Sequence, residues 1–260
     1  SKLMNPPISV TRCKFQLGCL FGLVLLPLLI YFNALKGSFH FDDQRLLSRS
    51  WIADIDHFHK DVRLEAVQNR PILLLTYALN NTLHPTQVFG FHLTNILLHI
   101  LVSILIFHIL QRVQYFFAGE ETGISGLPLI AAFLFALHPL NTDSVSYISS
   151  RSSILATFFY LLTVYGFLAV FLTRSSKYNK AGMIFFCLFC FYLAIASKLI
   201  AVTLPVLLGS WFLFIHRDTL PKFQRIGRQA IFIFGAAGLV FLAVFFYLVW
   251  KGDMFPRDQG

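Results

Sequence analysis

The sequence predicts an all-α integral membrane protein with about seven transmembrane helices. Mean hydropathy is +0.69, and only 13% of the residues are charged, against about 25% in ordinary soluble domains. Several apolar runs reach the roughly 20 residues that a helix needs to cross a bilayer. The net charge of +9 comes largely from Lys and Arg between these runs, so a membrane orientation signal explains it better than nucleic-acid binding.

Seven segments are expected to span the membrane. They are 15–32, 88–110, 127–148, 150–173, 181–197, 199–216 and 229–250. The first lacks a small-residue cleavage site and is longer than a signal-peptide core, so it is expected to be a retained anchor. The third is apolar only as far as Pro139. One helix over 181–216 would extend about 54 Å, so a hairpin is expected at Ala196-Ser197-Lys198.

The distribution of Lys and Arg predicts the orientation. With the N-terminus inside, the four inner segments hold 11 of the 21 Lys and Arg residues. Positive residues favour the cytoplasmic side, so the N-terminus is expected there. We therefore expect a cytoplasmic N-terminus (1–14), a seven-helix transmembrane module (15–250) with a long outer loop (33–87), and an outer tail (251–260). The apolar residues of that loop predict helices lying along the membrane surface.

Five charged residues are expected at the outer side of the membrane. Asp42 and Asp43 follow the first span in the stretch FHFDDQ, Asp143 follows the third, Arg151 begins the fourth, and Lys198 lies between the fifth and sixth. One such charge could be a simple interface anchor. Charges at membrane depth are costly and tend to mark substrate pathways, so five on one side predict a shared polar site.

Polar residues also follow one face of the second span. His92, Asn95 and His99 stand at i, i+3 and i+7. Hydrogen bonding between helices is the ordinary reading of this pattern, and a metal or haem site that also uses His108 is the alternative.

Three smaller motifs have structural interpretations. Cys187 and Cys190 form a C-x-x-C inside an apolar helix without a second ligand pair, so packing is expected. His138-Pro139 is expected to end the third span. Asn80-Asn81-Thr82 fits a glycosylation sequon on the outer side, close to an apolar run.

Four stretches together resemble one family of membrane enzymes. They are NRPILLLTYALNNTL (69–83), PTQVFGFHLTNILLHIL (85–101), LFALHPLNTDSVSYISSRSSILA (134–156) and ASKLIAVTLPVLL (196–208). With FHFDDQ, they occur in the same order in the transmembrane and tetratricopeptide-repeat O-mannosyltransferases and their bacterial relatives, which belong to the GT-C glycosyltransferases. The resemblance covers about residues 15–216.

The resemblance implies a seven-helix module with a long first outer loop. It also implies an inverting transfer of mannose or another hexose from a polyprenyl-phosphate donor to a protein or glycan hydroxyl. The membrane would be the bacterial inner membrane or the endoplasmic reticulum, with the site facing the periplasm or lumen. The family's acidic pair corresponds to Asp42 and Asp43, and the acidic residue of its second outer loop to Asp143.

The chemistry of such a transfer suits these residues. A carboxylate can take the proton of the acceptor hydroxyl, and Asp42 is the first choice. Mg²⁺ or Mn²⁺ held by Asp42, Asp43 and Asp143 could relieve the repulsion of the adjacent carboxylates. Fixed cations stabilise the departing phosphate, and the outer candidates are Arg151, Lys198 and Arg70.

The sequence departs from the family pattern at two positions. Ser153 and Leu199 stand where the family usually carries acidic residues. Where the family has C-terminal tetratricopeptide repeats, only KGDMFPRDQG follows the last predicted span, so either the chain is truncated or acceptor recognition is expected to lie in a partner. A catalytically silent scaffold or assembly subunit of a larger membrane complex is therefore the alternative function. An unrelated carrier or cofactor-binding membrane protein is a third.

Overall fold

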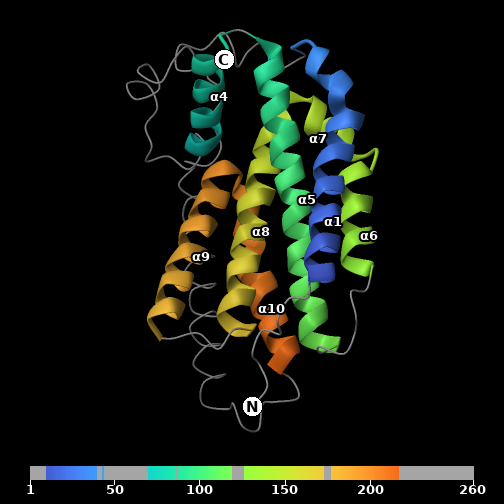
Figure 1. The fold of residues 1–260 in the computed structure, drawn as a ribbon. Coiled ribbons are helices and arrows are strands. Elements are labelled where there is room, and N and C mark those ends of the chain that lie inside the picture. The colour runs from blue at the N-terminus through green and yellow to red at the C-terminus, as the bar shows by residue number, and fades with distance from the viewer. Residues whose placement is uncertain are drawn as a thin grey trace, which may run out of the picture. The chain divides into compact units, whose positions relative to one another are not determined.

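The computed structural model describes residues 10–39, 43, 70–85, 87–118, 126–172 and 177–216. These residues are almost entirely helical and contain no strand (Figure 1). The chain divides into one unit up to Ala201 and another from Val202, and each is described by itself.

The elements follow one another in chain order. They are α1 (Val10–Ile30), η1 (Tyr31–Lys36), α4 (Pro71–Leu83), α5 (Val88–Ala118), α6 (Leu127–Leu137), α7 (Asn141–Ser146), η4 (Ile148–Ser150), α8 (Arg151–Leu172), α9 (Lys177–Ser197), η5 (Leu199–Thr203) and α10 (Leu204–His216). The three η elements are 3₁₀ helices.

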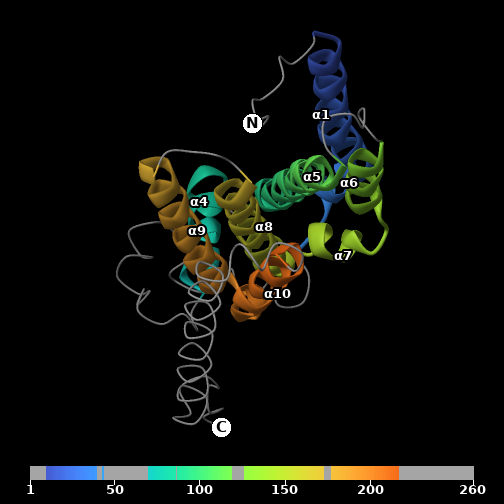
Figure 2. The same cartoon turned by 90° about the horizontal axis from the view of Figure 1, so that it is seen from below.

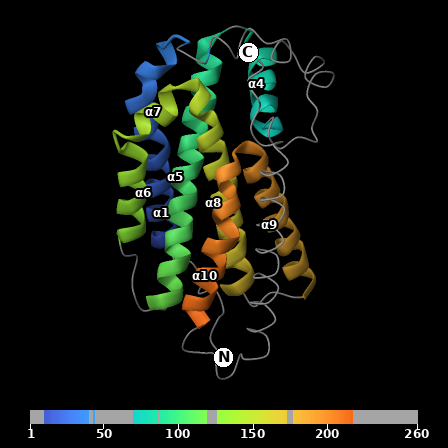
Figure 3. The same ribbon diagram turned by 180° about the vertical axis from the view of Figure 1, so that it is seen from behind.

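The first unit is a bundle centred on α5. Helices α1, α6 and α8 pack against α5, and α9 packs against α8 (Figures 1 and 2). The chain direction alternates from one long helix to the next. Consequently η1, α7, the start of α8 and the end of α9 lie at one end of the bundle, beside α4 (Figures 1 and 3). We call this end the α4 end, and α4 contacts α5, α8 and α9 there.

Four described helices are long and apolar enough to cross a membrane. They are Gln16–Lys36, Val88–Phe117, Ile148–Val170 and Lys180–Ser197. They match four of the predicted spans and support the prediction of an integral membrane protein. A shorter apolar helix at Leu199–Phe212 lies in the sixth predicted span, and 229–250 lies outside the described residues, so the count of seven spans stays a prediction.

The predicted single span over 127–148 is wrong. Helix α6 has only 11 residues, about 17 Å of helix against about 30 Å of hydrocarbon. It ends at Leu137 because His138 adopts an extended backbone before Pro139, as is usual for a residue that precedes proline. The Nδ2 of Asn141 then donates to the Phe135 carbonyl at 2.6 Å and satisfies one group at the helix end. The predicted helix end at His138-Pro139 is confirmed.

The predicted hairpin point is confirmed as a helix end. Helix α9 ends at Ser197, and the Lys198 N–H donates to the Ala194 carbonyl at 3.0 Å. Lys198 therefore stands at the C-terminus of α9, at the α4 end.

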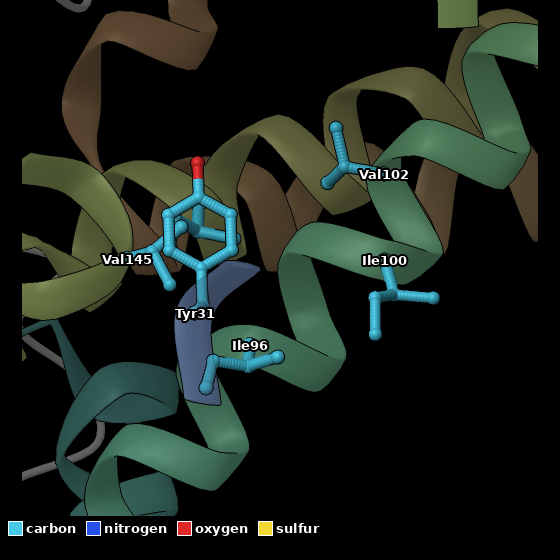
Figure 4. Packing of buried hydrophobic residues seen from close by; sticks show 6 residues of the cluster. Tyr31, Ile96, Ile100, Val102 and Val145 are labelled. Atoms are coloured by element: carbon cyan, nitrogen blue, oxygen red, sulfur yellow. The ribbon is translucent and has the colours of Figure 1, made fainter. Parts of the chain in front are cut away.

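Two apolar clusters hold the bundle together. The first contains Tyr31, Ile96, Ile100, Val102, Val145 and Ile154 (Figure 4). The second contains Cys19, Leu23, Phe107, Ala132 and Ala136. Large apolar side chains of α1 and α9 are exposed instead, as expected for surfaces that face lipid.

Helices α8 and α9 approach closely at Gly166. A Cβ at this position would lie 2.7 Å from the Cys187 Sγ, which lies 3.8 Å from the Thr163 carbonyl. Cys190 is buried as well. Small residues of this kind let membrane helices pack tightly, so both cysteines serve packing, as predicted.

Replacing Gly166 with alanine should loosen this contact. The added methyl group overlaps the Cys187 Sγ, and overpacking of this kind costs about 1–3 kcal/mol. Thermal unfolding of the purified protein in detergent should show a lower midpoint for Gly166→Ala.

Gly182→Ala provides the matched control, because a Cβ there meets nothing within 4 Å. It should leave the midpoint unchanged or raise it. Adding Cys187→Ala to Gly166→Ala should restore the midpoint. A double variant as unstable as Gly166→Ala alone would contradict this account of the contact.

Candidate functional site

Side chains from three elements hold the junction between α7 and α8. The N–H and the hydroxyl of Ser149 both donate to the Asp43 Oδ1, at 2.9 and 2.5 Å. The Tyr77 hydroxyl donates to the Ile148 carbonyl at 2.9 Å. The Asn95 Nδ2 donates to the carbonyls of Val145 and Tyr147, at 3.3 and 3.4 Å. Asp43, α4 and α5 thus all meet at this junction.

Arg151, the first residue of α8, has no exposed surface. Its Nε donates to the Asn95 Oδ1 at 2.8 Å, and one terminal nitrogen donates to the Phe91 carbonyl at 2.9 Å. The other contacts the carbonyl and hydroxyl of Thr76, at 3.2 and 3.3 Å. The guanidinium also lies 4.6 Å from the centre of the Tyr77 ring. One side chain therefore joins α4 and α5 to α8.

The junction contains one negative side chain, Asp43, and one positive side chain, Arg151. The Asp43 side chain is only 2% exposed, and its charge acts favourably on Arg151. Burial raises the pKa of Tyr77 well above its usual range, and the nearby Arg151 charge only partly opposes this. The Tyr77 hydroxyl therefore keeps its proton at neutral pH and acts as a donor.

Lys198 forms a second polar contact at the α4 end. Its Nζ donates to the Ser153 Oγ at 2.7 Å and so links the end of α9 to the first turn of α8. Within the part of the chain that the structure describes, no carboxylate forms an ion pair with Lys198. The adjacent Leu199 is exposed, and it carries no charge that could take that place.

The other predicted site residues lie less deeply. Asp143 is exposed in the first turn of α7, at the α4 end. Arg70 is exposed just before α4 and has φ 47°, a left-handed conformation that non-glycine residues seldom adopt. Asp42 lies outside the described residues. The structure thus brings Asp43 and Arg151 together in one network and pairs Lys198 with Ser153.

The polar face of α5 is buried. Besides Asn95, the His99 Nε2 donates to the Ala136 carbonyl at 3.0 Å, and its ring contacts those of Tyr31 and Phe135. His92 is 2% exposed and faces Gly37, where a Cβ would lie 2.9 Å from the His92 Nε2. Asn95 and His99 thus supply hydrogen bonds between elements. In the described residues no three His, Cys, Asp or Glu side chains gather as metal ligands.

The sequon at Asn80 is not presented to the solvent. The Asn80 side chain is 7% exposed, and its Nδ2 donates to the Thr94 hydroxyl at 2.9 Å and to the Gly90 carbonyl at 3.3 Å. The Asn80 amide nitrogen joins α4 to α5, so it is not available to accept a glycan. The placement of the sequon on the outer side stays a prediction.

Three residues of the network were missed by sequence reasoning. Tyr77 and Thr76 lie in the apolar run of α4, and Ser149 lies in the polar stretch YISSRSS. The hydroxyl of Tyr77 is a signal in itself, since phenylalanine would pack as well without needing a partner. Nothing in the sequence pairs Ser149 with Asp43, because 106 positions separate them.

Comparison with known proteins yields one consistent group of relatives. The chain is 27% identical over 151 residues to protein O-mannosyl-transferase F38B6.6 of Caenorhabditis elegans, which covers 54% of the chain and 21% of that protein. It is 31% identical over 139 residues to the mouse protein O-mannosyl-transferase TMTC4, covering 50% of the chain and 18% of the relative. The resemblance to the O-mannosyl-transferases is confirmed. Human protein O-mannosyl-transferase TMTC1 is 34% identical over 93 residues, 36% of the chain and 10% of that protein.

The match covers only part of each relative. The chain spans about a fifth of the length of the first two O-mannosyl-transferases. No family model matches the chain, and no solved structure matches it. The relatives therefore establish homology over part of the chain, and the activity in their names is a proposal for this one.

Removing the Arg151 guanidinium should destabilise the bundle strongly. Arg151→Met leaves the Asn95, Thr76 and Phe91 oxygens without their donor, and each such loss costs about 1–3 kcal/mol. We expect a loss of about 3 kcal/mol or more in the free energy of unfolding in detergent. Arg151→Lys should recover only part of this free energy. The compact ammonium of lysine lacks the planar, forked arrangement of donors by which the guanidinium reaches all three oxygens.

Arg70→Met is the control for the loss of a positive charge at the same end. Arg70 is exposed, so its replacement should change the free energy of unfolding by about 0.5 kcal/mol or less. Equal effects of Arg151→Met and Arg70→Met would show that the hydrogen bonds of Arg151 do not stabilise the fold.

Asn80 should carry no glycan. The protein produced in eukaryotic cells should show no shift in mass at this residue after enzymatic deglycosylation, because its amide nitrogen is buried and hydrogen-bonded. Asn80→Leu should lower thermal stability. An oligosaccharide found on Asn80 by mass spectrometry would contradict the packing of α4 on α5.

Proposed function

We propose that the protein is a glycosyltransferase that moves mannose or another hexose from a polyprenyl-phosphate donor to a hydroxyl group of a protein or glycan. One observation carries the proposal: homologues at 27–34% identity named as protein O-mannosyl-transferases. The gathering of charged residues at the α4 end of the bundle supports it, since charges near a membrane seldom persist without a function.

The proposed site faces away from the cytoplasm. The excess of Lys and Arg in the short segments that the sequence predicts to be inner supports a cytoplasmic N-terminus. The α4 end then faces the lumen of the endoplasmic reticulum or the bacterial periplasm.

We assign the role of general base to Asp42. The acceptor hydroxyl loses its proton as it attacks the sugar, and a positioned carboxylate accepts that proton. The Oδ1 of Asp43 already accepts two hydrogen bonds from Ser149. We therefore assign Asp43 a holding role, because its carboxylate is bound to Ser149 at the α7–α8 junction.

The described residues do not by themselves form a metal site. No three potential ligands lie together among them. The expected Mg²⁺ or Mn²⁺ remains a proposal on Asp42, Asp43 and Asp143, which are oxygen donors of the kind that these ions prefer.

Lys198 is the residue that we propose for the donor phosphate, with Arg70 as a second cation. Lys198 is half-buried, and no carboxylate in the described part of the chain neutralises it. Arg151 differs, because its guanidinium is fully buried and bound to protein groups. Its proposed contribution to the donor site is indirect: it holds α4 and α5 against the start of α8.

A silent scaffold subunit remains the second candidate. Its support is that Asp43 and Arg151 both bind protein groups, while Ser153 and Leu199 carry no carboxylate. In that case the bundle would keep its fold and bind partner subunits without transferring sugar.

A transfer assay decides between the two. The chain is placed in lipid nanodiscs with polyprenyl-phosphate mannose and an acceptor protein that has exposed hydroxyl side chains. The amount of mannose transferred to this acceptor is then measured. Asp42→Asn should lower the rate by about 100-fold or more, the range expected for loss of a general base. Asp253→Asn, in the predicted tail, should leave the rate unchanged.

Absence of sugar transfer would reject the enzymatic proposal. If the unaltered chain transfers no more sugar than Asp42→Asn with any donor offered, the scaffold function is favoured and the enzymatic proposal is rejected. Donors with glucose or galactose in place of mannose test the sugar in the same assay.

A further inference from the structure

We propose that Ser153 and Lys198 together bind the phosphate of a membrane lipid, with Ser153 donating a hydrogen bond that Lys198 orients. This gives Ser153 a binding role that its neutral side chain does not suggest from the sequence. The proposal rests on the proposed function only for the identity of the lipid, a polyprenyl phosphate.

The hydrogen bond between the two side chains fixes their roles. A serine hydroxyl has one proton to donate and two lone pairs that accept. Because the Lys198 Nζ must donate, the Ser153 Oγ accepts, and the hydroxyl proton is directed elsewhere. Apart from the backbone hydrogen bonds of its helix, Ser153 has one further hydrogen bond within the described residues: its carbonyl accepts from the Thr157 hydroxyl. One hydroxyl proton and two ammonium protons therefore remain for a ligand.

The surroundings favour an anion over a cation. Lys198 has no carboxylate partner among the described residues, and Asp43 is bound to Ser149. The fully buried Arg151 lies only two positions before Ser153 and adds positive charge. Ser153 is in the first turn of the 22-residue helix α8, where the helix dipole also favours negative charge.

The depth of the pair indicates a lipid ligand. Ser153 is near the start of the span Ile148–Val170, and Lys198 directly follows the span Lys180–Ser197. Both side chains therefore lie where an apolar span meets the polar interface, the level at which lipid phosphates are found. A long-chain phosphate ester can place its phosphate there and its chain against the exposed apolar side chains of α9.

A carboxylate at position 153 would close this site. It would form an internal ion pair with the Lys198 Nζ, which lies 2.7 Å from the present hydroxyl oxygen, and it would repel a phosphate. Ser153→Asp is thus a sharper test than removal of the hydroxyl, because it changes the charge of the site and leaves Lys198 in place.

The experiment measures binding of polyprenyl phosphate to the whole chain in phosphatidylcholine nanodiscs by native mass spectrometry. Lys198→Met and Ser153→Asp should each weaken binding by about 100-fold, as expected for loss of a charge-assisted contact. Ser153→Ala should weaken it by about fivefold to tenfold, and Lys198→Arg should retain most of it.

Two variants serve as matched controls. Thr157→Ala removes a hydroxyl one turn along the same helix, and Ser144→Asp adds a negative charge on the separate helix α7. Both should bind polyprenyl phosphate within about twofold of the unaltered chain. Thermal unfolding of every variant shows that it is folded, and Ser153→Thr, which keeps a hydroxyl, should bind nearly normally.

The outcomes separate this inference from the proposed function. Unchanged binding in folded Ser153→Asp and Lys198→Met overturns the inference, and sugar transfer at the normal rate by both variants overturns it while the proposed function stands. Binding that requires the pair in a chain that transfers no sugar supports the inference and rejects the proposed function. Equal binding of phosphatidic acid, or displacement by inorganic phosphate alone, supports an anion site but counts against selection of a polyprenyl lipid.

Discussion

The α4 end of the bundle depends on one fully buried guanidinium. Arg151 begins α8 and donates to oxygens on α4 and α5, so three elements are fixed relative to one another by a single side chain. A buried charge is tolerated only when its donors are satisfied, and here neutral oxygens and the face of Tyr77 satisfy them. The junction that Asp43, Tyr77 and Asn95 also hold is therefore rigid where the predicted chemistry requires rigidity.

This constraint separates the charged residues by role. Arg151 and Asp43 are turned inward and bound to protein groups, whereas Lys198 is half-buried with only the neutral Ser153 as its hydrogen-bond partner. A cation that binds a lipid phosphate must be accessible to it and must not be neutralised by a carboxylate. Among the described residues, Lys198 meets both conditions. The absence of carboxylates at positions 153 and 199 is compatible with a catalytically silent protein. It also leaves the positive charge of Lys198 available to a phosphate.

Apolar periodicity and length were sufficient to predict much of the fold. Four spans, the end of α6 at His138-Pro139 and the end of α9 at Ser197 all follow from hydropathy, proline chemistry and bilayer thickness. The single span at 127–148 was wrong because the break at His138-Pro139 divides this stretch, and the polar residues after Pro139 form the separate helix α7. The sequon at Asn80 gave no information about the burial of its amide, which the structure shows to be almost complete.

The membrane class, the relationship to the O-mannosyl-transferases and the presence of charged residues beside the apolar runs could all be predicted from the sequence. These properties depend on composition, on local patterns and on residue order. Folding is what binds Asp43 and Arg151 to protein groups, because their partners lie 56 to 106 positions away. A hydrogen bond depends on distance in space, and a sequence records only distance along the chain.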